Sequence, residues 1–550
     1  MNGRTLLLLS LAALALAYRF YGGWLARHFG LDDSRATPAH ARRDGVDFVP
    51  AAPPVLMGHH FASIAGASPI VGPVLASVFG WVAVWVWILL GAIFLGAVHD
   101  FTSLMASLRH GGAGIGTLIE DYLGRRGKLL FLGFAWLTLL LVIAVFTLIV
   151  ARTFVLVPAS AGSSLLFIVL AVGFGLLIGP LRMPLLPATL LGVVALFLCL
   201  WLGLAWPLDP ARIGLDPARA TTVWRWLILA YIWIASVTPV HWLLQPRDYL
   251  NSFLLYAMMG LGVAGVLLVG PEFRVPAFTG LSAPSIGALF PLLFVTVACG
   301  AISGFHSLVA SGTTVRQLDR ESHARPVAYG SMLVESLLAV LALIAAASSL
   351  GPERLAGLAT GDAIPVFSQA LAGFMVRLGL PFEAGTSFIS LTVAAFALTS
   401  LDTATRLARF LWEELARDIA PHTPLLQNRQ VATGITVAGG ALLLFSPAGM
   451  GIWPLFGTAN QLLAALALLT VAIWLARSGD TAWFVRLPLI FMLAVCLSSL
   501  VLQIQSFWSA GRPVPALLAA LLLAMTLLLV SDAVRALWTK HDPGAPSRAR

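Results

Sequence analysis

Long apolar runs alternate with short polar segments along almost the whole chain. A run of about 20 apolar residues can cross a bilayer as one helix, so the pattern predicts about 15 membrane-spanning helices. A shorter run at 363–380 is interrupted by Pro365 and Arg377, which predicts a re-entrant or interfacial segment. The expected helices lie near residues 5–24, 55–77, 82–105, 128–156, 161–181, 184–206, 223–244, 251–270, 288–312, 328–350, 385–405, 431–449, 453–476, 484–506 and 514–536.

The composition points to the same class of protein. Hydrophobic residues make up 59% of the chain and charged residues 10%, whereas soluble proteins carry about 25% charged residues. We therefore predict an all-α polytopic membrane protein in a lipid bilayer, and the net charge of +9 is not taken as a sign of nucleic-acid binding. If the N-terminus is outside, 24 of the 33 Lys and Arg residues fall on the cytoplasmic side, which predicts a cytoplasmic C-terminus.

The N-terminal run has two interpretations. Its basic Arg4, apolar core and small residues resemble a secretory signal peptide. The aromatic residues between Tyr18 and Trp24 suit a membrane interface and favour a first transmembrane helix. The three cysteines lie in apolar runs and form neither a disulfide framework nor a CxxC pair, so we predict no metal and no cofactor.

The segment 55–77 carries too many polar and helix-breaking residues for a helix that faces lipid. It reads LMGHHFASIAGASPIVGP from residue 56 to residue 73. Its two prolines remove backbone donors and Gly66 weakens the turn before them, which predicts a helix broken inside the membrane. We expect Ser63, Gly66 and Ser68 to bind substrate, and His59 and His60 to carry a coupling proton. A close-packed helix contact of small residues is the alternative.

A second interruption is expected in the helix at 223–244. Ser236, Thr238 and His241 lie in an apolar run there, together with Pro239. The helix begins five helices after the first broken one and runs in the opposite direction, which is the offset of a five-plus-five inverted repeat. We therefore predict that Ser236, Thr238 and His241 complete the substrate site.

The helix at 288–312 ends in a stretch rich in hydroxyl groups. Ser303, Ser307 and Ser311 are four residues apart and share one stripe of the helix. The stripe could coordinate Na⁺ or a carboxylate, or its serines could bond to their own backbone. His306 favours a functional role, so Ser303, His306 and Ser307 are assigned to substrate binding. The candidate ion site consists of Ser311, Thr313 and Thr314.

Carboxylates also occur within the apolar helices. Asp100 ends one helix and Glu335 lies inside another. A carboxylate at membrane depth either binds a proton or pairs with a basic group, so both are candidate proton carriers. Asp402 and Arg406 are four residues apart at the end of a further helix, which favours a local ion pair.

Several longer motifs resemble the carbon starvation protein A (CstA) family. They are GHHFASIAGASPIVGP at 58–73, HDF at 99–101, LLQPRDYLNSF at 243–253, CGAISGFHSLVASGTT at 299–314, TSLDTATRLARF at 399–410 and WPLFGTANQLLA at 453–464. The resemblance implies a bacterial inner-membrane carrier of the amino acid–polyamine–cation superfamily that takes up pyruvate or peptides with protons. It also implies a LeuT-like core, with 55–77 as its first helix, 223–244 as its sixth and 288–312 as its eighth. The region 351–385 is shorter than the family pattern, and His99 stands where Gln is common.

The sequence therefore predicts a secondary active transporter and not an enzyme. Proton symport of pyruvate is the leading hypothesis, import of di- or tripeptides is the alternative, and Na⁺ is a second candidate for the coupling ion. A metal-dependent membrane enzyme built on His59, His60, Asp100 and His306 is the least favoured hypothesis, because the chain lacks HExxH, GxSxG and P-loop motifs. The expected units are residues 1–54, a first helix and cytoplasmic loop; 55–405, a core of two inverted repeats; and 406–550, C-terminal helices and a cytoplasmic tail.

Overall fold

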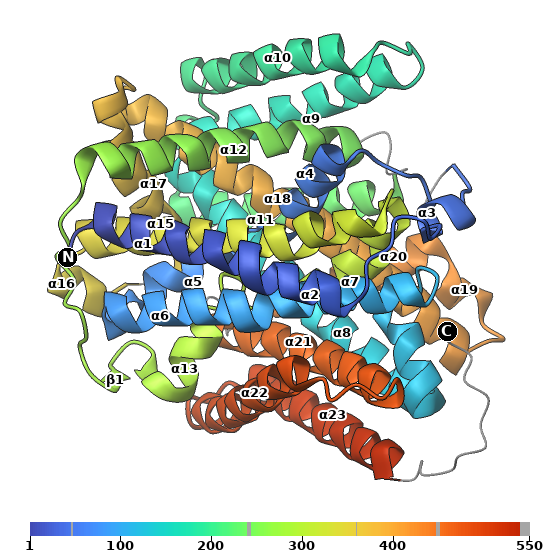
Figure 1. Ribbon diagram of the computed structural model, residues 1–550. Helices are drawn as coiled ribbons and strands as arrows, with labels where there is room; N and C mark the ends of the chain where they lie inside the picture. The colour runs from blue at the N-terminus through green and yellow to red at the C-terminus, as the bar shows by residue number, and fades with distance from the viewer. Residues whose placement is uncertain (46–47, 239–243, 359, 447–451, 539–550) are drawn as a thin grey trace.

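The computed structural model describes residues 1–45, 48–238, 244–358, 360–446 and 452–538 (Figure 1). These residues are almost all helical, and they include one antiparallel pair of two-residue strands, β1 (Ser282–Ala283) and β2 (Gly287–Ala288). Twelve of the described helices are long and apolar enough to cross a membrane, or 13 if one bent pair is counted as a span. The predicted all-α polytopic class is therefore confirmed.

The helices follow one another with short connections, and π-helical turns join α1 to α2 and α6 to α7. The first half contains α1 (Gly3–Leu16), α2 (Gly22–His28), α3 (Pro38–Ala41), α4 (Pro53–Ile64), α5 (Ser68–Ala76), α6 (Trp81–Gly91), α7 (Ala97–Arg109), α8 (Ile115–Leu156), α9 (Pro158–Ile178), α10 (Leu185–Ala205), α11 (Pro217–Val237) and α12 (Leu244–Val269). The second half contains α13 (Leu289–Thr296), α14 (Gly304–Val309), α15 (Ser331–Ser349), α16 (Pro352–Ala356), α17 (Ala363–Met375), α18 (Phe382–Ile419), α19 (Pro424–Gln427), α20 (Arg429–Leu444), α21 (Trp453–Arg477), α22 (Trp483–Ser509) and α23 (Pro513–Trp538).

Three of the expected spans are not single long helices in the described residues. The span at 55–77 divides into α4 and α5, which meet at a bend of 48°. The span at 288–312 divides into α13 and α14, and the one at 431–449 is represented by α20, which has 16 residues. The run at 363–380 forms the 13-residue α17, which is too short to count as a span.

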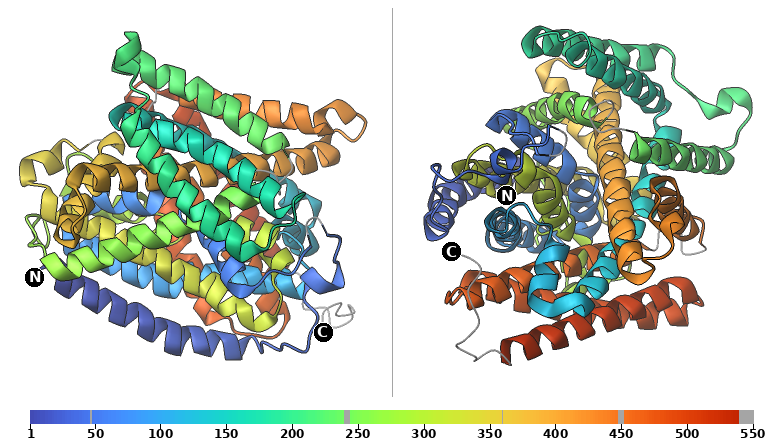
Figure 2. Two further views of the ribbon diagram at one scale, coloured as in Figure 1. Left: turned by 90° about the horizontal axis from the view of Figure 1, so that it is seen from above. Right: turned by 90° about the vertical axis from the view of Figure 1, so that its right-hand side faces the viewer.

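The most buried spans lie in the middle of the bundle. The segments 321–349, 382–419 and 453–477 are each 89% buried over their most apolar window, whereas α10 is 22% buried. The α9–α10 hairpin covers one side of the bundle, and α22 and α23 cover the opposite side (Figures 1 and 2). Side chains with unusual polarity are therefore concentrated in the central helices.

The two broken helices pass each other in the centre. The first half of one contacts the second half of the other, because α4 packs against α14 and α5 packs against α13. They therefore run in opposite directions with their breaks side by side. In the first, Ala65 leaves the helical conformation just before Pro69, which has no N–H to donate. In the second, Val297 and the extended Ser303 bound the interruption.

The expected position of the second break was wrong. α11 ends at Val237 and α12 begins at Leu244, and both are apolar enough to be counted as separate spans. Ser236 and Thr238 therefore lie at the end of a helix and not at a break inside one. His241 lies outside the described residues. The second break lies instead at 297–303 of the 288–312 span, where Gly300 lies in the interruption and no proline occurs between 297 and 303.

Glycines of three neighbouring segments pack directly against the backbone of the second break. A Cβ at Gly72 of α5 would lie 2.6 Å from the carbonyl oxygen of Thr296. Cβ atoms at Gly96 and Gly457 would lie even closer to the carbonyl oxygens of Ala301 and Val295. Real side chains do not approach backbone this closely, so the surrounding helices require glycine here.

We expect Gly72→Ala to destabilise the protein by about 1–3 kcal/mol, because the added methyl group overpacks rigid backbone. Thermal unfolding of the purified protein in detergent measures the effect. Gly434→Ala is the matched control, since nothing lies within 4 Å of a Cβ built there on α20. Equal melting temperatures for Gly72→Ala and the control would contradict the close packing.

Candidate functional site

A cavity of about 540 Å³ lies along the first half of the first broken helix, α4, close to its break. It lies at the end of the bundle where residues 29–45, 48–52, 110–114 and 315–324 meet, which we call the loop end. There the Val49 N–H donates to the carbonyl of Arg316, and a Cβ at Gly112 would contact Phe48. Ser63, one residue before the end of α4, lines the cavity. The other polar lining residues are His59, Asp248, Tyr249, Thr313, Arg316, Gln317, Thr403 and Arg406.

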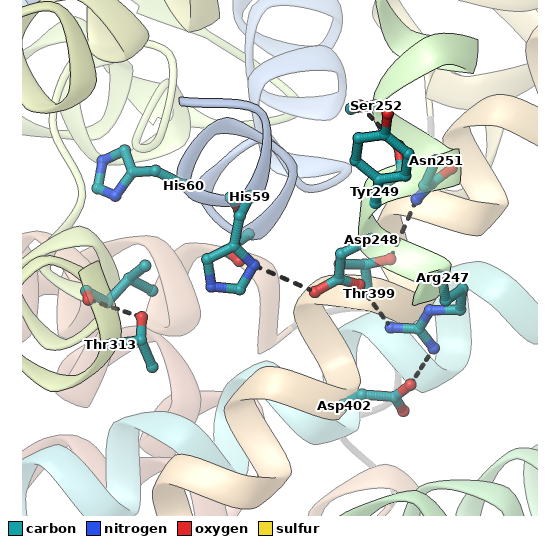
Figure 3. Close-up of polar contacts among 12 residues, drawn as sticks. His59, His60, Arg247, Asp248, Tyr249, Asn251, Ser252, Thr313, Thr399 and Asp402 are labelled. Carbon is teal, nitrogen blue, oxygen red and sulfur yellow. Dashed lines mark hydrogen bonds and ion pairs between the residues drawn. The ribbon is translucent and has the colours of Figure 1, made fainter. Parts of the chain in front are cut away.

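A buried ion-pair network lies beside this cavity (Figure 3). Arg247 of α12 pairs with Asp402 of α18, and its second terminal nitrogen lies 3.2 Å from Asp248 Oδ1. The Tyr231 hydroxyl of α11 donates to Asp402 Oδ2 at 2.8 Å. The side chains of Arg247 and Asp402 are 2% and 0% exposed. The network therefore joins three helices while Asp248 faces the cavity.

The expected local pair between Asp402 and Arg406 was wrong. Asp402 pairs with Arg247, which is 155 residues away in sequence. Arg406 instead donates to the backbone carbonyls of Ala235 and Thr238, at 2.8 and 2.6 Å. It thereby neutralises the negative end of α11, which is a favourable place for a cation.

The adjacent histidines of α4 face different surroundings (Figure 3). His59 lines the cavity, and its Nδ1 lies 3.8 Å from Asp248 Oδ2. His60 Nδ1 forms a 2.8 Å hydrogen bond with Thr314 Oγ1 on the other side of the helix. Successive residues of a helix point about 100° apart, so this division follows directly from the sequence.

A second buried cluster lies behind α4, away from the cavity. Asp100 Oδ2 on α7 is 2.9 Å from His306 Nδ1 on α14, and its Oδ1 is 2.8 Å from His99 Nδ1. Glu335 Oε2 on α15 lies 3.4 Å from His306 Nε2. All four side chains are fully buried. The cluster brings together three residues that the sequence placed on separate helices: Asp100, His306 and Glu335.

The remaining serines and threonines of the hydroxyl-rich stretch have local partners. Ser307 and Ser311 donate to the carbonyls of Gly304 and Ser307, which is the structural alternative considered from the sequence. Thr313 donates to the Val309 carbonyl and also lines the cavity. Ser303 bonds to Asn460 of α21, whose side-chain oxygen also accepts the N–H of Phe305. Asn460 thus satisfies polar groups that the helix break exposes.

The other expected substrate residues are not gathered at the cavity. Gly66 lies at the first break, where a Cβ would be 2.8 Å from the Phe146 ring. Ser68 is buried at the start of α5. Ser236 Oγ lies 3.5 Å from Thr433 Oγ1, and the Thr238 hydroxyl donates to the Ile234 carbonyl. Of the nine expected substrate residues, Ser63 alone is part of the cavity lining within the described residues.

The sequence reasoning missed the strongest charges of the cavity. Asp248, Arg316 and Arg406 line it but were not assigned to the site. The pair Arg247–Asp248 inside QPRDYLNS was the available signal, since two adjacent charges in an apolar segment need partners. Among the described residues, no group of three or more His, Cys, Asp or Glu side chains is arranged to hold a metal ion.

A cavity beside a discontinuous central helix, with titratable groups on both faces of that helix, is typical of secondary transporters. A family model described as carbon starvation protein CstA matches residues 2–356 and 348–499. The chain therefore belongs to the CstA family, as the motifs indicated.

Named relatives align over most of their own length. The peptide transporter CstA of Campylobacter jejuni is 33% identical over 90% of this chain and 80% of its own. The peptide transporter CstA of Helicobacter pylori strain J99 is 34% identical over 92% of this chain and 82% of the relative's length. The pyruvate/proton symporter BtsT of Escherichia coli is 31% identical over 88% of this chain and 79% of the symporter's length. The solved structure of a manganese transporter of Eremococcus coleocola aligns with 90% of this chain and 99% of the transporter's chain, at 13% sequence identity and a TM-score of 0.46.

Proposed function

We propose that this protein is a secondary transporter that imports a small organic nutrient together with protons across the bacterial inner membrane. The observation that carries the proposal is the position of the cavity along α4, up to Ser63, two residues before the break between α4 and α5. Broken helices offer free backbone groups to substrates, which unbroken helices do not. The names of the relatives, peptide transporter and pyruvate/proton symporter, support the same function.

The cavity would face the cytoplasm. Its loop end carries Arg35, Arg42, Arg43, Arg316 and Arg320, and short loops rich in basic residues stay on the cytoplasmic side. This orientation places the N-terminus outside. The conformation would then be the one that releases substrate into the cell.

The broken helices would be the first and sixth helices of a LeuT-like core. α6–α7, α8, α11 and α12 lie between them if the peripheral α9–α10 hairpin is treated as an insertion. Each repeat then has five helices, and the second consists of α13–α14, α15, α18, α20 and α21. This order makes 289–309 the sixth core helix in place of 223–244, and it agrees with the antiparallel contact of the two breaks.

The charges of the cavity favour a substrate with both an ammonium and a carboxylate group. Asp248 supplies a carboxylate, and Arg316 and Arg406 supply guanidinium groups. The volume of about 540 Å³ is within the range of about 300–1,000 Å³ that ligand pockets occupy. A short peptide uses both signs of charge, whereas pyruvate uses only the cations. Peptide import is therefore the function that the geometry favours, with pyruvate as the second candidate.

Proteoliposomes with an inward proton gradient test the function. We expect accumulation of a labelled dipeptide or of labelled pyruvate that stops when an ionophore removes the gradient. Replacing Na⁺ by choline should leave uptake unchanged if protons are the coupling ion. Uptake that ignores the proton gradient would contradict proton coupling, and accumulation of neither substrate would contradict the proposed function.

Asp248→Asn should distinguish the two substrates. We expect dipeptide uptake to fall by about ten- to a hundredfold, because the lost charged hydrogen bond to the ammonium group is worth about 1.5–3 kcal/mol. Pyruvate uptake should fall less, since pyruvate has no ammonium group. Asp121→Asn, an exposed carboxylate of α8 outside the cavity lining, is the control. Equal losses for the two substrates would count against an ammonium contact at Asp248.

A further inference from the structure

Buried polar atoms without partners gather on the side of α4 that faces away from the cavity. Such atoms are rare in folded proteins, because desolvation without a hydrogen bond is costly. The residues concerned are at most 1% exposed. The atoms that lack a hydrogen-bond partner among the described residues include His60 Nε2, Ser68 Oγ, His99 Nε2, Ser103 Oγ, His306 Nε2, Ser331 Oγ and both carboxylate oxygens of Glu335.

Helix geometry places these groups along one connected path. Ser331 precedes Glu335 by four residues on α15, so the two share a face. Ser103 follows Asp100 by three residues on α7, and Ser107 follows by seven, so these three form one stripe. The contact from Glu335 through His306 to Asp100 joins the two helices.

The path leads toward the loop end of the bundle. Ser107 donates to the carbonyl of Ala113, in the turn that follows α7. That turn contains Gly112, where a Cβ would lie 3.1 Å from the Phe48 ring and 3.2 Å from Pro38 of the loop end. The polar groups therefore extend from the broken helices in the centre to the same end at which the cavity lies.

The helix α4 separates this path from the cavity. His59 on one face lines the cavity, whereas His60 on the other face bonds to Thr314 and lies close enough to Asp100 and His306 for their charges to interact. None of Asp100, Ser103, Ser107 and the other described path residues belongs to the cavity lining. A substrate in the cavity therefore does not touch the path.

Charge balance gives the path one exchangeable proton. The charged and titratable groups that face Glu335 are His306 of α14, Asp100 of α7 and Cys299 of the 297–303 break. His306 is the one basic group of this set and contacts both carboxyl groups, so it can neutralise at most one of them. A proton on Glu335 removes the surplus charge, since unpaired buried charges are unfavourable.

We infer that protons pass through this protein by a route of their own, from Glu335 by way of His306 and Asp100 along Ser103 and Ser107 to the loop end, separate from the substrate cavity. The inference rests on the proposed function. The relay runs from the form in which His306 is neutral and its Nδ1–H donates to the Asp100 carboxylate. Glu335 gives its proton to the free Nε2, and the imidazolium so formed gives its Nδ1 proton to Asp100, so the imidazole ends in its other tautomer. Water held by the unpartnered serines of the path carries the proton from Asp100 onward, because buried water occupies polar sites with several partners.

Ser103→Leu tests the route by replacing a hydroxyl group with an apolar side chain. We expect accumulation driven by a proton gradient to fall by about a hundredfold, the usual scale of a lost proton-transfer group. Counterflow of substrate, which moves no net protons, should be unchanged. Ser103→Thr should retain accumulation because it keeps the hydroxyl group.

A second variant adds no bulk and avoids misfolding. Ser103→Ala combined with Ser331→Ala should show the same loss of accumulation with counterflow retained. Ser336→Ala is the matched control, since this buried serine of α15 donates to the Leu333 carbonyl and is outside the path. Equal loss of accumulation and counterflow, or no loss of either, would overturn the separate route.

An infrared measurement separates failure of the route from failure of the proposed function. The protonated carboxyl band of Glu335, identified by its loss in Glu335→Gln, should shift quickly when the purified protein is placed in D₂O. The shift should be much slower in Ser103→Leu, whatever the substrate is. An equal rate of exchange in both proteins would overturn the route, whereas absence of both accumulation and counterflow in the native protein would overturn the transport function.

Discussion

Arg247→Ala is expected to destabilise the protein by about 3–5 kcal/mol, the largest effect on stability that the structure predicts for a single substitution. Arg247 is 2% exposed and contacts two carboxylates, those of Asp248 and Asp402. Its removal leaves both of them in the interior without their cation. Thermal unfolding in detergent and elution as a single species on size-exclusion chromatography measure the effect.

Removal of the opposite charge should partly restore stability. In Arg247→Met combined with Asp402→Leu, both members of the closest pair become apolar, and such replacements often cost little. Arg35→Ala is the matched control, because Arg35 and Asp32 form a pair whose side chains are 55% and 46% exposed. We expect that control to change stability by less than about 1 kcal/mol. A loss for Arg247→Ala no larger than this control would show that the network is not a structural anchor.

Glu335→Gln is expected to have the largest effect on transport. Glutamine keeps the size of the side chain but cannot exchange a proton, so accumulation driven by a proton gradient should fall by about a hundredfold. Counterflow should persist, and its rate should become independent of pH over the range in which the native protein responds. Uptake and counterflow in proteoliposomes at several pH values measure both effects.

The control for this substitution is a carboxylate with no place in the cluster. Glu383 is exposed at the start of α18. Glu383→Gln should retain accumulation and counterflow. A Glu335→Gln protein that still accumulates substrate against its gradient would rule out Glu335 as the coupling group.

The length and spacing of the apolar runs were sufficient to predict the all-α class and twelve of the expected spans. The break at 65–67 was also predictable, because Pro69 cannot donate a backbone hydrogen bond and Gly66 lies next to it. The break at 297–303 was missed because that stretch contains no proline. Its glycines and serines fit a helical stripe as well as an interruption, and only packing against Asn460 distinguishes the two.

Long-range pairs limited the prediction of the site. The partner of Asp402 could be sought only nearby in the sequence, and Arg406 at the next turn was the obvious choice. The actual partner, Arg247, lies on α12 and meets α18 only in the folded protein. The opposite orientation of His59 and His60 required no such knowledge, because it follows from the rotation of the helix.

The glycines around the second break restrict how this protein can move. Because Gly72, Gly96 and Gly457 leave no room for a methyl group against the backbone at 295–301, that backbone cannot slide past its neighbours. α5, α13, α21 and the π-helical turn at 92–96 would therefore turn together as one rigid block. Any change of angle between α4 and this block would then be taken up at 65–67, where the chain leaves the helical conformation.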